Sequence, residues 1–202
     1  MKTKIKVLAI LSAVVFGLCA FKSLETKKVI VIDAGHGGHD FGAKMYDFEE
    51  KTIVEAISKK VKELNKDKDV EIVLLREGDH FMELSERVSI INNIKPDLVV
   101  SLHINSVLND WKKDQVDAYV SNKNEKFKQE SMDSAEKLLS NVSNESLKKG
   151  KVKEAPFYIM KNSNCPSVLL ELGYLTNETN RAYITSASGQ NEIAAKILEA
   201  VK

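Results

Sequence analysis

The sequence is poor in cysteine, proline and tryptophan and carries almost no net charge. Its 202 residues include two cysteines, three prolines and one tryptophan, and its net charge is only +1. This balance of charge argues against a nucleic-acid-binding surface over the whole chain, so we expect no nucleic-acid partner. Repeats, low-complexity segments and proline-rich linkers are absent. Together with the length, these absences predict one folded domain.

The N-terminus has the pattern of a targeting segment. The basic start MKTKIK precedes the apolar run VLAILSAVVFGLCAF, which falls short of the ~20 apolar residues of a membrane-spanning helix. A short apolar run after a basic segment is typical of a secretory signal. We therefore predict that residues 1–22 are a signal peptide, cleaved after Ala20, or an N-terminal anchor. Lipidation of Cys19 is the less favoured alternative, because Leu18 stands where a small residue is expected.

If this segment is removed, the mature chain keeps one cysteine, Cys165. A disulfide within the chain is then excluded, and so is a structural metal site built from cysteines. Cys165 precedes Pro166 at the start of an apolar run, and no histidine lies near it in the sequence. We expect it to be a small buried hydrophobic residue rather than a nucleophile.

Short apolar runs alternate with amphipathic helical patterns along the rest of the chain. The apolar runs predict strands over residues 27–34, 70–76, 97–105, 116–121, 155–160 and 166–173. Apolar residues spaced three or four apart predict helices over residues 49–64, 82–94, 125–147 and 190–202. Alternation of strands and helices, with strands that are apolar throughout, predicts an α/β fold. We expect a single twisted, mainly parallel sheet with helices on both faces.

The stretch VIVIDAGHGGHDFGAK, residues 29–44, places glycines and histidines directly after an apolar run. Glycine-rich turns in this position often bind phosphate, but a P-loop requires a lysine followed by serine or threonine, and this loop has neither. A dinucleotide-binding pattern read from Gly35 requires a third glycine where Asp40 stands. We therefore interpret the loop as part of a metal site rather than a phosphate site.

Several of the predicted strands end in polar side chains that can bind a metal. His36 follows the first strand, while His103 and Glu171 lie near the ends of two later ones. Glu50 opens the first helix, which rises from the same edge of the sheet. Ligands gather beyond the carboxyl ends of strands in such a sheet, so these side chains can converge. Two histidines and a glutamate form a known catalytic zinc set, and a further carboxylate can act as a general base.

These residues lie in longer segments that resemble the zinc-dependent N-acetylmuramoyl-L-alanine amidases, which trim bacterial peptidoglycan. The matching segments follow the family's order and span residues 29–180: IVIDAGHGGHDFGA, EEKTIVEAISKKV, IVLLREGD, LSERVSIIN, DLVVSLHIN and SVLLELGYLTNETN. The glycine–histidine loop and the LELGYLTN segment are specific in combination. The resemblance implies hydrolysis of the amide between MurNAc and L-alanine, with peptidoglycan or muropeptides as the substrate.

The resemblance also implies a role for each candidate residue. His36, Glu50 and His103 match the family's Zn²⁺ ligands, and Glu171 matches its catalytic glutamate. Glu49 is the alternative to Glu50 as a ligand. We choose Glu50 because a lysine follows it, as in the family.

The resemblance further implies that residues 23–202 form a zinc amidase catalytic domain, exported to the periplasm or cell envelope of a bacterium. We expect a monomer that meets the membrane only through an N-terminal anchor. The helix predicted at 125–147 looks like part of the ordinary fold, so we expect a site that is open without an activator. Another zinc peptidase acting on stem peptides and a non-catalytic peptidoglycan-binding protein are the alternative functions.

Other residues near these segments are less clearly assigned. The family does not use the position of His39, which we expect at the rim of the site. We expect His80 to face solvent, and Trp111 either to contact substrate or to pack on its loop. Arg76 and Arg87 match recurrent arginines, for which pairing with acidic residues and binding of stem-peptide carboxylates are the two interpretations.

Overall fold

The computed structural model describes residues 27–202, so the predicted signal or anchor segment lies outside the described residues. One six-stranded sheet has the strand order β4-β1-β5-β8-β6-β7. The strands are Lys28–Ala34 (β1), Val70–Leu74 (β4), Leu98–Asn105 (β5), Gln115–Val120 (β6), Lys148–Glu154 (β7) and Ser167–Tyr174 (β8). Neighbours run parallel except β6 and β8, which are antiparallel. The predicted α/β fold with a mainly parallel sheet is confirmed.

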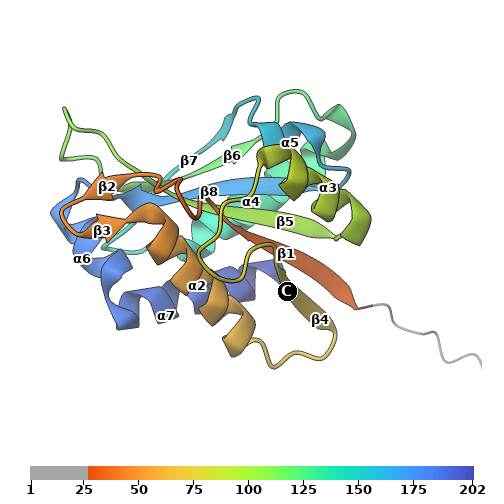
Figure 1. Ribbon diagram of the computed structural model, residues 1–202, viewed down its shortest axis with the longest axis horizontal. Helices are drawn as coiled ribbons and strands as arrows, with labels where there is room; N and C mark the ends of the chain where they lie inside the picture. Colours follow the sequence, from red (N-terminus) through yellow and green to blue (C-terminus); the bar gives the residue numbers. More distant parts are fainter. Residues whose placement is uncertain (1–26) are drawn as a thin grey trace, which may run out of the picture.

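Helices cover both faces of this sheet (Figure 1). They are Glu50–Leu64 (α2), Leu84–Ile94 (α3), Lys128–Val142 (α4), Tyr158–Asn162 (α5), Glu178–Thr185 (α6) and Ala187–Val201 (α7), with a 3-10 turn at Glu125–Phe127 (η1). A small hairpin of Lys44–Met45 (β2) and Phe48–Glu49 (β3) precedes α2. Helices α2, α4 and α7 bury the larger core cluster against the sheet, and α3 and α5 bury the smaller one. Among residues 27–202, no helix is long and apolar enough to cross a membrane.

The central strands are apolar on both faces because each face is covered. Along β1, Ile30 and Ile32 enter the larger cluster while Val31 enters the smaller one. Along β5, Val99 lies in the smaller cluster, on the side of α3 and α5. Successive side chains of a strand alternate between faces, so His103, four residues on, lies on this same side. The helices on this side therefore border the carboxyl end of β5, where the candidate site begins.

One predicted strand is wrong. Residues 155–160 were expected to be a strand, but the structure has α5 from Tyr158 to Asn162 and places the strand earlier, at β7. The β7 sequence KKGKVKE is polar because it forms an edge of the sheet, where lysine side chains are common. Its polar composition hides it from a search for apolar runs. The short run APFYIM cannot be assigned by periodicity alone, since apolar runs of this length fit either element.

The helix predicted in this part of the sequence is present as α4. It is shorter than the predicted 125–147 and packs with α7, β6 and β7. Its buried residues, such as Ala135 and Leu138, belong to the larger core cluster. That cluster lies on the face opposite α3 and α5, so α4 does not cover the edge that carries His103.

Candidate functional site

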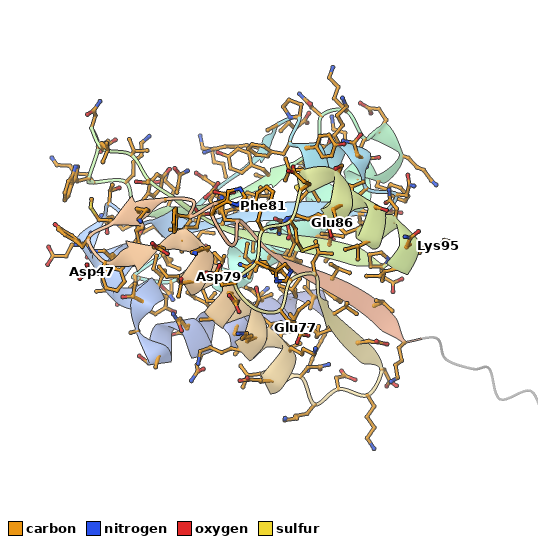
Figure 2. The ribbon with its side chains drawn as sticks, viewed as in Figure 1. Asp47, Glu77, Asp79, Phe81, Glu86 and Lys95 are labelled. Atoms are coloured by element: carbon orange, nitrogen blue, oxygen red, sulfur yellow. The ribbon has the colours of Figure 1, made fainter. Side chains whose placement is uncertain are left out.

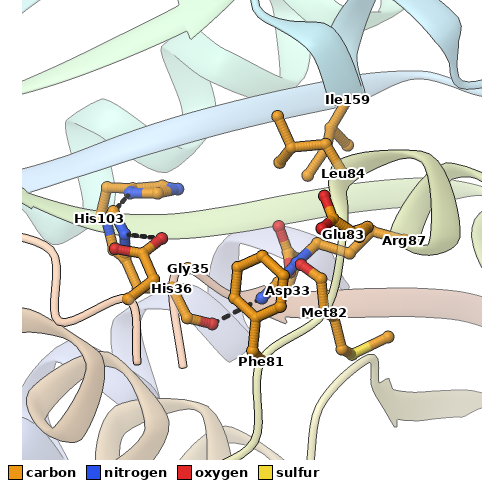
Figure 3. Close-up of a pocket in the computed structure, with 11 residues that line it drawn as sticks. Asp33, Gly35, His36, Phe81, Met82, Glu83, Leu84, Arg87, His103 and Ile159 are labelled. Carbon is orange, nitrogen blue, oxygen red and sulfur yellow. Dashed lines mark hydrogen bonds and ion pairs between the residues drawn. The ribbon is translucent and has the colours of Figure 1, made fainter. Parts of the chain in front are cut away.

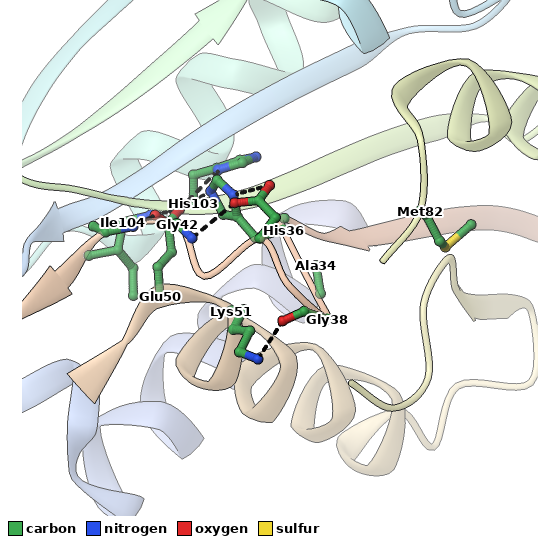
Figure 4. Close-up of polar contacts among 12 residues, drawn as sticks. Ala34, His36, Gly38, Gly42, Glu50, Lys51, Met82, His103 and Ile104 are labelled. Carbon is green, nitrogen blue, oxygen red and sulfur yellow. Dashed lines mark hydrogen bonds and ion pairs between the residues drawn. The ribbon is translucent and has the colours of Figure 1, made fainter. Parts of the chain in front are cut away.

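Three of the predicted ligands meet at one point. His36 lies on the loop after β1, His103 on β5 and Glu50 at the start of α2. The Oε1 atom of Glu50 lies 3.0 Å from Nε2 of His36 and 3.0 Å from Nδ1 of His103. The two ring nitrogens are 3.2 Å apart. Figure 4 shows the three side chains pointing toward one another.

Backbone amides orient the Glu50 carboxylate. Its Oε1 accepts the amide of Ile104 at 2.9 Å, and its Oε2 accepts the amide of Ala43 at 2.7 Å. Burial alone would favour the neutral acid, but the hydrogen bonds and charges of His103 and His36 lower the pKa of Glu50 to about 2. Glu50 is therefore an ionised, fixed oxygen donor. Glu49, the alternative ligand, instead pairs with Lys44.

The glycine–histidine loop adopts a conformation that few side chains allow. His36 has a positive φ of 62°, in the left-handed region where residues other than glycine are uncommon. A Cβ at Gly42 would lie 2.5 Å from Oε2 of Glu50 and 2.6 Å from the His36 ring, and one at Gly35 would overlap the His103 ring. These two glycines therefore make room for the converging side chains. Gly35 and Gly42 thus face the imidazole rings, while Gly37 and Gly38 lie against the loop that carries His80 and Phe81.

Asp40 holds the far side of the His36 ring, a role that the sequence analysis missed. Its Oδ2 lies 2.9 Å from Nδ1 of His36, while its Oδ1 accepts the Gly42 amide at 3.1 Å. Burial lowers the pKa of His36, but Glu50 and then Asp40 outweigh it and raise this pKa to about 9. A carboxylate on the outer nitrogen of a histidine is a common support of metal ligands. The spacing of four residues from His36 to Asp40 was the available signal.

Two buried arginines bind the glycine–histidine loop through hydrogen bonds. Arg87 donates to Oδ1 of Asp33 at 2.5 Å and to the carbonyl oxygens of Ala34 and His36. Arg76 pairs with Glu55 at 2.9 Å and also donates to backbone carbonyls. Both arginine side chains are almost fully buried. Pairing with acidic residues is therefore the interpretation that the structure supports, although Arg87 also contributes to the lining of a cavity beside His103.

Glu171 lies beside the cluster on the next strand. It is the register partner of His103 on β8, and both line a cavity of about 230 Å³ with Leu84, Phe157 and other apolar residues. Its Oε2 is buried and, among the described residues, has no hydrogen-bond partner. Burial raises the pKa of Glu171 to about 7, with His103 opposing the rise and Glu50 adding to it. Such a carboxyl group exchanges a proton near neutral pH.

A second cavity, of about 390 Å³, adjoins the first and shares Leu84, His103 and Ile159 with it (Figure 3). Figure 3 shows Phe81, Met82 and Leu84 across this hollow from the two histidines. Asp40 and Glu83 add acidic groups to its lining. The cluster of His36, Glu50 and His103 is thus accessible from a hollow rather than sealed within the core.

The donor set fits a zinc ion. The candidate ligand atoms of His36, Glu50 and His103 all lie within 4.8 Å of one another. Ligand atoms about 2.0–2.1 Å from a tetrahedral zinc ion would be roughly 3.3 Å apart, close to the separations observed. Imidazole nitrogens and a carboxylate oxygen suit zinc, and a three-residue set leaves a position open for catalysis.

The remaining candidates lie outside this set. The exposed His39 packs its ring on Phe81 at 4.1 Å, and His80 is exposed on the same β4–α3 loop that carries Phe81 (Figure 2). Trp111 is half exposed and donates its ring N–H to the carbonyl of its own loop residue Leu108. Cys165 is buried, as predicted, and burial raises the pKa of its thiol to about 12, which keeps it protonated.

Comparisons with known proteins show the family to which the chain belongs. Residues 30–202 match the Amidase_3 family, described as N-acetylmuramoyl-L-alanine amidase. A putative N-acetylmuramoyl-L-alanine amidase of Buchnera aphidicola subsp. Baizongia pistaciae is 30% identical, over 86% of this chain and 94% of that one. The crystal structure of an N-acetylmuramoyl-L-alanine amidase from Clostridium difficile 630 is similar with a TM-score of 0.81 and 28% identity, over 87% and 95% of the two chains. The CwlD amidase from Clostridioides difficile, solved in complex with the GerS lipoprotein, gives 0.78 and 29%, over 87% and 96%.

Proposed function

The chain belongs to the N-acetylmuramoyl-L-alanine amidase family, and we propose that its amidase activity depends on a zinc ion held by His36, Glu50 and His103. The observation that carries this proposal is the meeting of two ring nitrogens and one carboxylate oxygen at separations of 3.0–3.2 Å. Two backbone amides donate hydrogen bonds to Glu50, and the Asp40 carboxylate accepts one from the His36 ring, so these ligand atoms are held in place. The substrate is the amide that joins MurNAc to L-alanine in peptidoglycan or muropeptides.

Glu171 is the proton carrier of the proposed reaction. When bound, zinc would supply Lewis-acid polarisation of the amide carbonyl and a lower pKa for a water molecule. Glu171 accepts a proton from the attacking water and then delivers it to the leaving amine of L-alanine. Its position beside His103 and its pKa of about 7 suit both transfers.

Metal removal and replacement test the zinc dependence. The purified protein should lose peptidoglycan hydrolysis after treatment with a chelator and regain it on addition of about one equivalent of Zn²⁺. Elemental analysis before and after treatment links the activity to the metal content. Full activity in protein that contains no detectable metal would contradict the proposal.

The site of action follows from the substrate. We propose that the chain is exported and works in the cell envelope, either released from its N-terminal segment or anchored by it. Relatives named as probable cell wall amidases of Staphylococcus are consistent with this location. We also expect a monomer that is active without an activator, since the cavities beside His103 are open to solvent and α4 packs on the opposite face.

A further inference from the structure

The direction in which the substrate lies follows from the position of Glu171. If Glu171 donates a proton to the leaving amine, the L-alanine nitrogen must lie on its side of His103. The stem peptide that continues from L-alanine then leaves the centre across β8, toward β6 and β7. The adjoining hollow contains Asp40 and Glu83, and its one guanidinium, that of Arg87, is already committed to Asp33 and to backbone carbonyls.

A row of polar side chains marks this path. Glu171 on β8 pairs in register with His103 on one side and with Asp117 of β6 on the other. Residues paired in register on neighbouring strands lie on the same face of a sheet, about 4.8 Å apart. Asp117 in turn lines a groove of about 480 Å³ together with Lys151 and Lys153 of β7. The row therefore runs from His103 through Glu171 to Asp117, which lies at the border of a lysine-rich groove.

Lys153 is the cation that this row presents. Its Nζ lies 2.6 Å from Oδ2 of the buried Asp117, yet 39% of its side chain is exposed. The ammonium also lies 5.4 Å from the centre of the Tyr119 ring. An ammonium group carries three donors, so one bond to Asp117 leaves others for a ligand. Asp117 thus fixes the position of a charge that remains accessible.

Two neighbouring lysines of β7 are engaged elsewhere. Lys148 pairs with Asp114 at 2.6 Å, and Lys149 turns to α4, where it donates to Ser140 and approaches Glu136. The arginines for which carboxylate binding was considered are buried in ion pairs beneath the loop. Among the lysines that line the groove, Lys153 is the one whose ammonium is held by Asp117, the register partner of Glu171, so a stem carboxylate that leaves the centre across β6 comes first to this charge.

We propose that Lys153 binds the first free carboxylate of the stem peptide, the α-carboxylate of a γ-linked glutamate that follows L-alanine. This inference rests on the proposed amidase function. Consecutive Cα atoms are about 3.8 Å apart, so a carboxylate on the second residue lies roughly one strand spacing beyond the L-alanine nitrogen. Asp117, the register partner of Glu171, stands at that spacing and holds the Lys153 ammonium at 2.6 Å. The residue sets specificity and takes no part in bond cleavage.

Two matched substrates test this role. N-acetylmuramoyl-L-alanyl-γ-D-glutamyl-L-lysine and its counterpart with an α-carboxamide differ only in the proposed charge. The unaltered protein should prefer the free carboxylate by about threefold to tenfold in kcat/KM, the range for a partly exposed charged hydrogen bond. Lys153→Gln should abolish that preference by raising KM for the acidic substrate. The matched variant Lys149→Gln, altered on the other face of β7, should retain it.

A double variant separates specificity from stability. Lys153→Gln leaves the buried Asp117 without a cation, so Asp117→Asn combined with Lys153→Gln removes both charges, and thermal unfolding checks the fold. The double variant should cleave both substrates with equal kcat/KM. A preference that persists in either variant, or that is absent from the unaltered protein, would overturn the inference. If the unaltered protein cleaves neither substrate, the proposed function fails instead.

Discussion

His103 and Glu171 occupy paired positions on the neighbouring parallel strands β5 and β8. One imidazole nitrogen of His103 joins the cluster with His36 and Glu50, while Glu171 stays outside it with a buried, unpartnered oxygen. Strand pairing therefore sets the proposed proton carrier beside a candidate metal ligand, and neither residue depends on a loop for its position. Two central strands buried on both faces are a rigid support for such a pair.

Glu171→Gln should remove the proton carrier and leave the ligand set intact. We expect a loss of about 10²–10⁴-fold in kcat, the usual contribution of general acid–base catalysis. The measurement is peptide release from purified peptidoglycan, with zinc content determined in parallel. Glu83→Gln, in the lining of the neighbouring hollow, is the control and should keep most of the activity. Release at the unaltered rate by Glu171→Gln would show that this residue is not the base.

Removal of a metal ligand should lower the zinc affinity more than removal of the residue that orients that ligand. His36→Ala should abolish detectable zinc binding, whereas Asp40→Ala should weaken it by about 10–100-fold, because Asp40 only orients the ring. Competition with a chromogenic zinc chelator measures both affinities. Asp47→Ala, exposed on the hairpin turn (Figure 2), is the matched control. Equal affinities for all three variants would place the metal elsewhere.

Zinc affinity should depend on pH through His36. Its pKa of about 9 in the metal-free protein means that the ring is protonated below that pH, and this proton must leave before the nitrogen binds a metal. Glu50, with a pKa of about 2, stays ionised throughout. We expect the apparent affinity to rise about tenfold per pH unit from pH 7 toward pH 9. Calorimetry in buffers of different ionisation enthalpy should detect close to one proton released per zinc at pH 7, and a release near zero would refute this assignment.

Arg87→Met should destabilise the fold as well as the site. It would leave Asp33, which is fully buried, with only the Ser101 hydroxyl as a side-chain partner. Breaking one partner of a buried ion pair costs about 3–5 kcal/mol in the free energy of unfolding. Urea denaturation measures the loss. Asp33→Asn combined with Arg87→Met should recover part of it, and a single variant as stable as the unaltered protein would contradict the account.

The apolar runs of the sequence predicted most of the strands. The candidate ligands and Glu171 were predicted from polar residues at the ends of those runs or at the start of a helix. His36, His103 and Glu171 stand out for that reason, since a charged or polar group at the end of a buried strand needs a partner. The groups that hold the candidate ligands in place could not be predicted in the same way. Asp40 acts through a left-handed turn, and the amides of Ala43 and Ile104 bond Glu50 only after the chain has folded. The lysine-rich β7 escaped detection because its solvated edge carries no apolar pattern.

Product analysis tests the central claim most directly. Purified muropeptides are incubated with the protein, with and without a chelator, and the products are identified by mass spectrometry. The account predicts a glycan that ends in free MurNAc and an intact stem peptide with L-alanine at its N-terminus, both absent when the chelator is present. Cleavage within the stem peptide would indicate a peptidase instead, and cleavage of the MurNAc amide that persists in the chelator would contradict the role of the metal.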